Sequence, residues 1–133
     1  MPHFKFRAWD KKKNDWFDDG DGELYIELNG NINFGWNGEI MDDYTDRVIL
    51  MQYTGMKDVK GIEIYEGDIV NNGQHAYLVC FGEFADSGDF QYPTKRQTGF
   101  YIVDVHTDGT YPLYSMTYEI VGNVYENPGL LED

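Results

Sequence analysis

Hydrophobic and polar residues alternate over short stretches of this chain, beginning with FKFRAW at residues 4–9. Side chains at even positions fall on one face and those at odd positions on the other. A period of two residues predicts a half-buried β-strand. The polar turn DKKKND follows, and Trp16 and Phe17 begin a return strand. Residues 4–17 are therefore expected to form a β-hairpin.

The same pattern recurs in short segments that Gly-rich turns separate. Strands are expected within residues 23–28, 48–53, 62–70, 75–84, 100–105 and 118–125. The run VILMQY at 48–53 is compatible with a strand or a helix, but the β-branched Val48 and Ile49 favour a strand.

The segments between these strands have other compositions. Residues 29–39, rich in Asn and Gly, are expected to be turns or irregular chain. Residues 55–61 are expected to be a loop between glycines, and residues 85–99 a long polar loop. The tail after residue 125 is expected to add one short helical turn.

Strands at roughly ten-residue spacing predict a mainly β protein with little helix, either a small barrel or a sandwich. The entry Gly67-Asp68 before Ile69-Val70 resembles the first strand of SH3-like barrels. We therefore expect an SH3-like barrel in residues 46–133 and an N-terminal hairpin or ribbon extension in residues 1–45. The 133 residues fit a single domain.

The formal net charge is −14, from 24 acidic and 10 basic residues. Because nucleic-acid binders normally carry a basic face, direct nucleic-acid binding is disfavoured. An acidic surface suits a basic partner or imitation of the charge of DNA, and it also keeps a small protein in solution.

The chain carries few features that would place it outside the cytoplasm. Its first ten residues have no apolar signal-peptide core, and no apolar run approaches the ~20 residues that span a bilayer. Cys80 is the only cysteine, which excludes an intramolecular disulfide. A soluble cytoplasmic protein without a membrane partner is expected.

Metal sites are not indicated. In DWFDDGDGE the spacing of an EF-hand loop fails, because Phe17 falls on a ligand position in either register. His3, His75 and His106 are scattered, whereas a zinc site needs three or four ligands. We expect no metal and no cofactor.

Catalytic signatures are equally sparse. Ser87 and Ser115 lie outside any G-x-S-x-G elbow, and Cys80 in YLVCF suits a buried, inert thiol. Glu63, Glu66 and Asp68 lie close together in sequence, but alternation points Glu63 to solvent. No catalytic residue is expected.

The basic residues gather at two expected loops. Lys11, Lys12 and Lys13 form a hairpin tip that Trp9 and Trp16 flank, and Lys95 and Arg96 lie in the long polar loop. Exposed aromatic and basic side chains favour binding surfaces, which makes these seven residues a candidate interaction surface. The alternative is a pair of ordinary solvated loop tips.

Three segments resemble the YopX family of phage and prophage proteins: FKFRAWDKKKNDW, LMQYTGMKDVKGIEIYEGDIV and YEIVGNVYENPGLL. The resemblance implies a small β-rich protein from phages or integrated elements, with no established activity and no catalytic residues to carry over. Structural roles are expected for the family's signature positions, which are Gln52, Tyr53, Thr54, Gly55, Tyr65, Glu66, Gly67, Asp68, Gly122, Asn123 and Tyr125.

Together these observations favour a non-catalytic protein-interaction module of a phage, with an unknown phage or host protein as partner. Exposed strand edges and aromatics also allow a homo-oligomer. The alternative is a modulator of nucleic-acid-binding proteins, acting by acidic DNA mimicry or by weak nucleic-acid contact through the basic loops. An enzyme is the least supported class.

Overall fold

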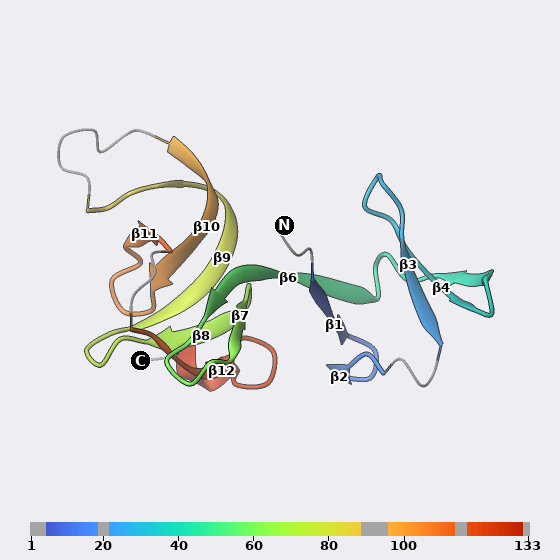
Figure 1. Cartoon of the computed structure of the whole chain (residues 1–133), viewed down its shortest axis with the longest axis horizontal. Helices are drawn as coiled ribbons and strands as arrows, with labels where there is room; N and C mark the ends of the chain where they lie inside the picture. Colours follow the sequence, from blue (N-terminus) through green and yellow to red (C-terminus); the bar gives the residue numbers. More distant parts are fainter. Residues whose placement is uncertain (1–4, 19–21, 89–95, 114–116, 132–133) are drawn as a thin grey trace. The chain divides into compact units, whose positions relative to one another are not determined.

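The protein is described here by a computed structural model that covers residues 5–18, 22–88, 96–113 and 117–131. These residues are mainly in β-strands, as the alternating pattern predicts (Figure 1). The chain divides into two compact units. The N-terminal unit is Phe6–Met51, and the C-terminal unit combines Gln52–Asp133 with Met1–Lys5.

In the N-terminal unit, β1 (Phe6–Asp10) and β2 (Asp15–Trp16) are antiparallel, with Trp9 opposite Trp16. On its other edge β1 lies beside β6 (Val48–Lys57), which begins in this unit and ends in the other. The run at 48–53 is thus a strand, as predicted. β6 also continues to Lys57, so the loop predicted for 55–61 begins too early.

A second sheet of the N-terminal unit contains β3 (Glu23–Ile26), β4 (Ile32–Trp36) and β5 (Glu39–Asp43), in that order. The prediction of turns or irregular chain over 29–39 holds for the turns at 29–30 and 37–38, but it is wrong for residues 32–36, which form β4, and for Glu39, which begins β5. Asn37 and Gly38 have φ of +52° and +83° and join β4 to β5 in a two-residue loop. Positive φ at both positions matches the right-handed twist of the flanking strands, and Asn-Gly is the preferred dipeptide there.

The C-terminal unit begins with the end of β6, beside β7 (Glu63–Tyr65). Its five-stranded sheet has the order β11-β10-β9-β8-β12 and curls strongly along β9 and β10 (Figure 1). These strands are β8 (Asp68–Asn71), β9 (Ala76–Ala85), β10 (Arg96–Asp104), β11 (Thr110–Pro112) and β12 (Glu119–Asn123). A 3₁₀ helix, η2 (Pro128–Leu131), follows, so the helical turn predicted for the tail is present.

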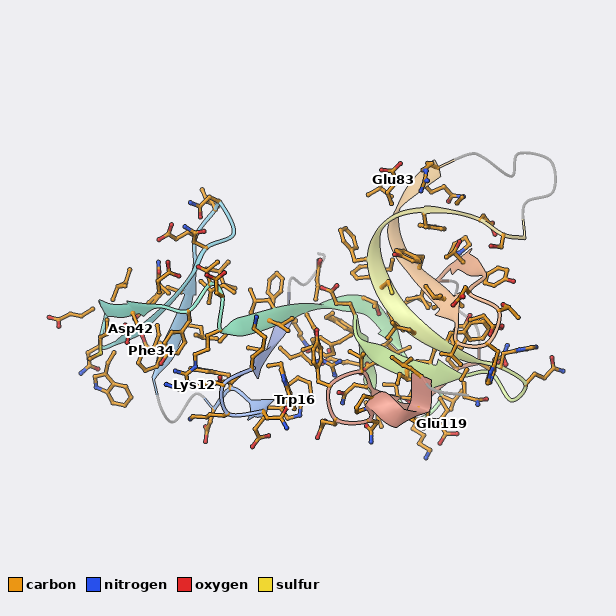
Figure 2. All side chains as sticks on the ribbon, turned by 180° about the vertical axis from the view of Figure 1, so that it is seen from behind. Lys12, Trp16, Phe34, Asp42, Glu83 and Glu119 are labelled. Atoms are coloured by element: carbon orange, nitrogen blue, oxygen red, sulfur yellow. The ribbon has the colours of Figure 1, made fainter. Side chains whose placement is uncertain are left out.

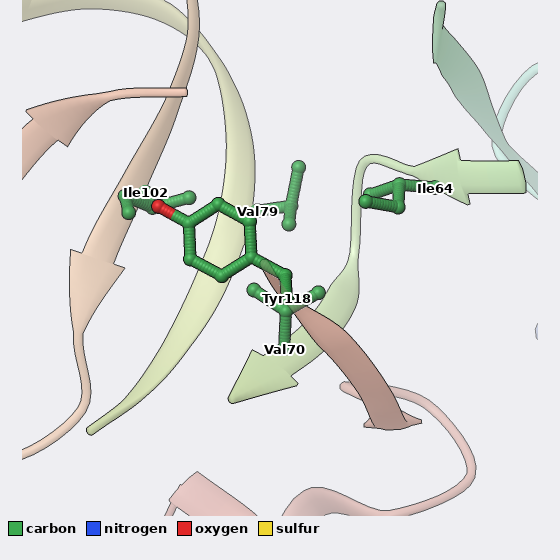
Figure 3. Close-up of a cluster of buried hydrophobic side chains, with 5 residues drawn as sticks. All are labelled: Ile64, Val70, Val79, Ile102 and Tyr118. Atoms are coloured by element: carbon green, nitrogen blue, oxygen red, sulfur yellow. The ribbon is translucent and has the colours of Figure 1, made fainter. Parts of the chain in front are cut away.

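The core of this unit is a cluster of buried hydrophobic side chains. Five buried residues form the cluster, as Figure 3 shows: Ile64, Val70, Val79, Ile102 and Tyr118. They come from β7, β8, β9, β10 and the residue before β12. Burial of side chains from five separate segments is what holds the curled sheet together.

The turn in IEIYEGDIV connects β7 to β8. Gly67 has φ of +88°, a left-handed conformation that glycine adopts without a Cβ clash. The Asp68 carboxylate accepts a hydrogen bond from the Tyr65 N–H at 2.8 Å. This pair of residues closes the turn and directs Ile69 and Val70 into the interior.

The long polar connection is shorter than predicted, because β9 extends to Ala85 and β10 begins at Arg96. Residues 89–95 of that connection lie outside the described residues. None of the described helical residues forms a helix with the length and apolar character needed to cross a membrane.

Candidate functional site

The sheet β3-β4-β5 has a hollow of about 490 Å³ on its surface. Five residues of β4, β5 and the connecting turn line it: Phe34, Trp36, Asn37, Glu39 and Met41. Of these, Trp36 is 51% exposed and Met41 64%. Large apolar side chains that gather in the open are characteristic of binding surfaces.

A β-bulge shapes this surface. Phe34 lies opposite Asp42 and Gly35 opposite Ile40, so Met41 is the extra residue on β5. Bulges of this kind redirect side chains at sheet edges. Gly35 lets the Glu39 carbonyl oxygen and the Tyr25 ring lie close to the β4 backbone, because a Cβ at this position would lie 2.2 Å from the oxygen and 2.8 Å from the ring.

Aromatic packing supports the base of the hollow. The Phe34 ring stacks on Tyr44, with centroids 4.8 Å apart and planes at 11°, and Phe17 meets it edge-on at 6.2 Å. The Arg47 guanidinium lies 4.3 Å from the centroid of the Tyr44 ring. Phe34 is therefore held in place by half-buried aromatic side chains, whereas Trp36 and Met41 are exposed to solvent.

Arg47 continues this chain of contacts to Asp10. Its Nε and Nη2 atoms donate hydrogen bonds to the two carboxylate oxygens of Asp10, at 2.9 and 2.8 Å. Asp10 is completely buried. The Arg47 hydrogen bond is the main cause that lowers the pKa of Asp10 below its ordinary value, so this carboxyl is ionised at neutral pH.

The predicted basic turn follows Asp10 directly. Asp10 Oδ1 accepts the backbone N–H groups of Lys12 and Lys13 at 3.0 and 3.3 Å, which fixes the turn. The side chains of Lys11, Lys12 and Lys13 are exposed (Figure 2 labels Lys12). The three lysines thus form a well-ordered basic tip.

The two tryptophans beside the turn do not share this exposure. Trp9 is only 5% exposed, so the exposure inferred for it from strand alternation is wrong. It packs edge-on against the half-buried Trp16, with centroids 5.1 Å apart and planes at 88°. The Arg7 guanidinium covers the Trp16 ring at 4.9 Å. Trp9 is therefore part of the interior of this unit.

The second basic pair belongs to the C-terminal unit. Arg96 begins β10 and pairs with Glu83 across the strands at 3.6 Å, with both side chains largely exposed. Lys95 lies outside the described residues. The predicted interaction residues are therefore divided between the two units.

The carboxylates considered as a catalytic group have separate partners. Glu63 pairs with Lys5 at 2.7 Å, Glu66 accepts the Gln52 backbone N–H at 2.9 Å, and Asp68 accepts that of Tyr65. Burial raises the pKa of the Cys80 thiol, which disfavours the reactive thiolate. Among the described residues, no three His, Cys, Asp or Glu side chains gather as a metal site requires.

The remaining signature positions have backbone and packing roles. Tyr53 packs against Tyr65 at 5.6 Å, and Gly55 has φ of +86°. A Cβ on Gly122 would lie 2.7 Å from Asn127 Oδ1. Asn123 Oδ1 accepts the backbone N–H groups of Tyr125 and Glu126 at 3.0 and 2.8 Å, which holds the turn before η2.

Trp36 and Met41 were not predicted as site residues from the sequence. The available signal was Asn37-Gly38 between short apolar runs, which marks a two-residue hairpin and places both flanking segments in strands. Charge was a second signal. Between Lys13 and Arg47 the sequence contains ten Asp or Glu residues and no Lys, Arg or His, so the hollow lies in the most acidic part of the N-terminal unit.

Two of the solved structures that are similar to this chain match it over nearly its whole length. Protein EF1440 from Enterococcus faecalis is 25% identical, with a TM-score of 0.52 over 99% of this chain and 100% of that one. Protein yopX from Bacillus subtilis is 23% identical, with a TM-score of 0.54 over 100% of this chain and 98% of that one. No curated protein matches the chain.

The second of these structures, by its level of identity, supports the fold alone. The family comparison carries the assignment, since the model described as YopX protein matches residues 5–132. That range contains the second and third segments on which the resemblance was based and all of the first except Phe4, and it covers nearly the whole sequence. The chain therefore belongs to the YopX family.

Proposed function

We propose that this protein is a non-catalytic protein-interaction module of a phage or prophage, which acts in the bacterial cytoplasm on a phage or host protein. The hollow of β4 and β5 is the observation that carries this proposal. Trp36 and Met41 line it with apolar side chains that are more than half exposed, and such exposure is costly unless a partner covers it.

The experiment is affinity capture from lysogenic or infected host cells, followed by mass spectrometry. Wild-type protein is compared with Trp36→Ala and with Phe81→Ala, a control in the C-terminal unit whose side chain is also about half exposed. Wild type and control should retain the same protein, and Trp36→Ala should lose it. Equal recovery by all three proteins, or no specific recovery, would contradict the proposal.

A second candidate function is modulation of nucleic-acid-binding proteins. The ten acidic residues between Lys13 and Arg47 favour charge mimicry of DNA. The alternative mode of action is weak contact with nucleic acid through the exposed lysines at 11–13. Mimicry requires that duplex DNA compete for the captured partner and that high salt release it. A partner retained in the presence of excess DNA would remove this function.

We also propose that the C-terminal unit is an SH3-like barrel within a single-domain protein. The sheet order β11-β10-β9-β8-β12 supports this, because four consecutive strands form a meander and the fifth returns beside the first. An experimental structure in which the two edge strands, β11 and β12, do not approach each other to close the sheet would contradict it.

Self-association is a related proposal, because strand edges and exposed aromatics are available to a second copy. Size-exclusion chromatography with light scattering tests it. A monomer at all concentrations would contradict it.

A further inference from the structure

We infer that the hollow receives an extended basic segment of a partner protein, in which Lys or Arg side chains accompany one large apolar anchor. The inference rests on the proposed interaction function and specifies its partner. Three features of the sheet β3-β4-β5 lead to it: an open strand edge, an apolar hollow and an excess of negative charge.

The open edge is β5. Among the described strands, β4 is its only neighbour, and all five of its residues, 39–43, are exposed. The outer backbone N–H and C=O groups of such a strand can pair with an added strand. An extended partner segment therefore has a backbone template along Glu39–Asp43.

The hollow supplies the anchor site. Its volume of about 490 Å³ exceeds that of one large side chain, and Phe34 forms a wall that Tyr44 holds by stacking. Met41 is unbranched and adapts to the shape of an inserted group. Trp36 presents an aromatic surface that attracts apolar groups and cations alike.

The charge selects a basic segment. Glu39 lines the hollow. Asp42 follows Met41 on β5 and lies opposite Phe34 (Figure 2 labels Asp42 and Phe34). No Lys, Arg or His occurs between residues 14 and 46, so these carboxylates attract cations in the partner. Phosphate groups, whether of nucleic acids or of lipid headgroups, would be repelled here.

The experiment uses the full-length protein and three synthetic peptides, with affinities from titration calorimetry and contacts from ¹⁵N shift mapping. The first peptide alternates Lys with Val around a central Leu. The second replaces every Lys by Glu, and the third replaces every Val and Leu by Ser. The first peptide should bind and shift the amides of residues 36–43. The third should bind about tenfold more weakly, as expected when a central apolar anchor is lost.

Two protein variants with equal change in net charge complete the test. Glu39→Gln/Asp42→Asn should weaken the first peptide about fivefold, as expected for two lost charge contacts at a binding surface. Glu83→Gln/Glu119→Gln removes two exposed carboxylates of the C-terminal unit and should leave affinity unchanged (Figure 2). Trp36→Ala should weaken binding about tenfold, in line with a buried aromatic contact.

Three results would overturn the inference. They are no binding of the first peptide, equal binding of the first and third, and equal losses in the two charge variants. Equal binding of the first and third peptides would show that charge alone acts, as DNA mimicry requires. If no peptide binds while host capture still depends on Trp36, the inference fails and the proposed function stands. If the first peptide binds but no host protein is captured, the inference stands and the proposed function fails.

Discussion

Arg47 and Asp10, 37 positions apart in sequence, form a two-point ion pair in the N-terminal unit. Asp10 is fully buried, and its carboxylate also caps the turn that carries the three lysines. On its other side Arg47 covers the Tyr44 ring, which supports Phe34. One guanidinium therefore connects the basic turn to the base of the hollow, so damage to this pair should reach both.

Asp10→Asn should destabilise the N-terminal unit by about 2–3 kcal/mol. Breaking a buried pair costs about 3–5 kcal/mol, and the Arg47 side chain keeps 24% of its surface in solvent, which reduces the loss. Urea unfolding followed by circular dichroism measures it. Lys5→Ala, which breaks the more exposed pair with Glu63, is the control and should cost clearly less, because solvent screens exposed ion pairs. Equal losses in the two variants would show that burial of Asp10 is irrelevant.

Acid should remove the contribution of Asp10. The Arg47 hydrogen bond is the largest cause that lowers the folded-state pKa of Asp10 below 3.8, and the backbone N–H groups of Lys13 and Lys12 lower it further. Burial acts in the opposite direction and raises this pKa. A lowered folded pKa gives stability that is complete above the unfolded pKa and is lost as pH falls through the folded one. The urea midpoint of wild type should therefore fall more steeply than that of Asp10→Asn from about pH 5 to pH 2. Parallel curves would contradict this.

Ile64→Ala should cost about 2–4 kcal/mol, because truncating a buried Ile loses transfer free energy and leaves a cavity. Ile64 is 1% exposed and belongs to the core cluster in Figure 3. Ile62, two residues earlier, is 53% exposed, and Ile62→Ala is the matched control with an expected cost below about 0.5 kcal/mol. Thermal unfolding compares them. Similar melting temperatures would place the core of the C-terminal unit elsewhere.

Gly38→Ala should destabilise the β4–β5 hairpin by about 1 kcal/mol, because any residue with a Cβ is strained at positive φ. Gly38 has φ of +83° and open space around it, so strain rather than a clash causes the loss. Gly129→Ala, also in open space but without a positive φ, is the control. Chemical-shift changes confined to β4 and β5 should accompany the loss. A neutral Gly38→Ala would argue against the left-handed turn.

Trp36→Ala should leave stability nearly unchanged, within about 0.5 kcal/mol, as is usual for exposed positions. Its ring is half exposed on the surface and lines the hollow. The same substitution is expected to abolish partner capture, so the two measurements separate binding from folding. A loss of several kcal/mol would make Trp36 a structural residue and remove it from the interaction surface.

Most strands of the C-terminal unit could be predicted from the sequence, because alternation is clear there. Val70, Val79 and Ile102 are buried, and they lie in β8, β9 and β10, which overlap the segments where the sequence predicts strands. The turn at Gly67 was predictable as well, since Gly-Asp after two alternating isoleucines implies a special backbone angle. Local pattern and tertiary packing agree in this unit.

The N-terminal unit was harder to predict. Trp9 follows the alternation of its strand, but period alone does not say which face is buried, and the ion pair of Asp10 turns that end of the strand inward. The hollow was not predicted, because its strands contain Asn, Gly and acidic residues, which have low strand propensity. Partner strands and the Asn-Gly turn outweigh that propensity.

The carboxylates along β5 also have a consequence for solubility. An exposed strand with a free edge invites the same edge of another molecule, and fibres grow when such contacts repeat. Two β5 edges brought together would place Glu39, Asp42 and Asp43 of each copy against like charges. The acidic edge therefore disfavours polymerisation of the protein with itself. A cationic strand would not meet this repulsion.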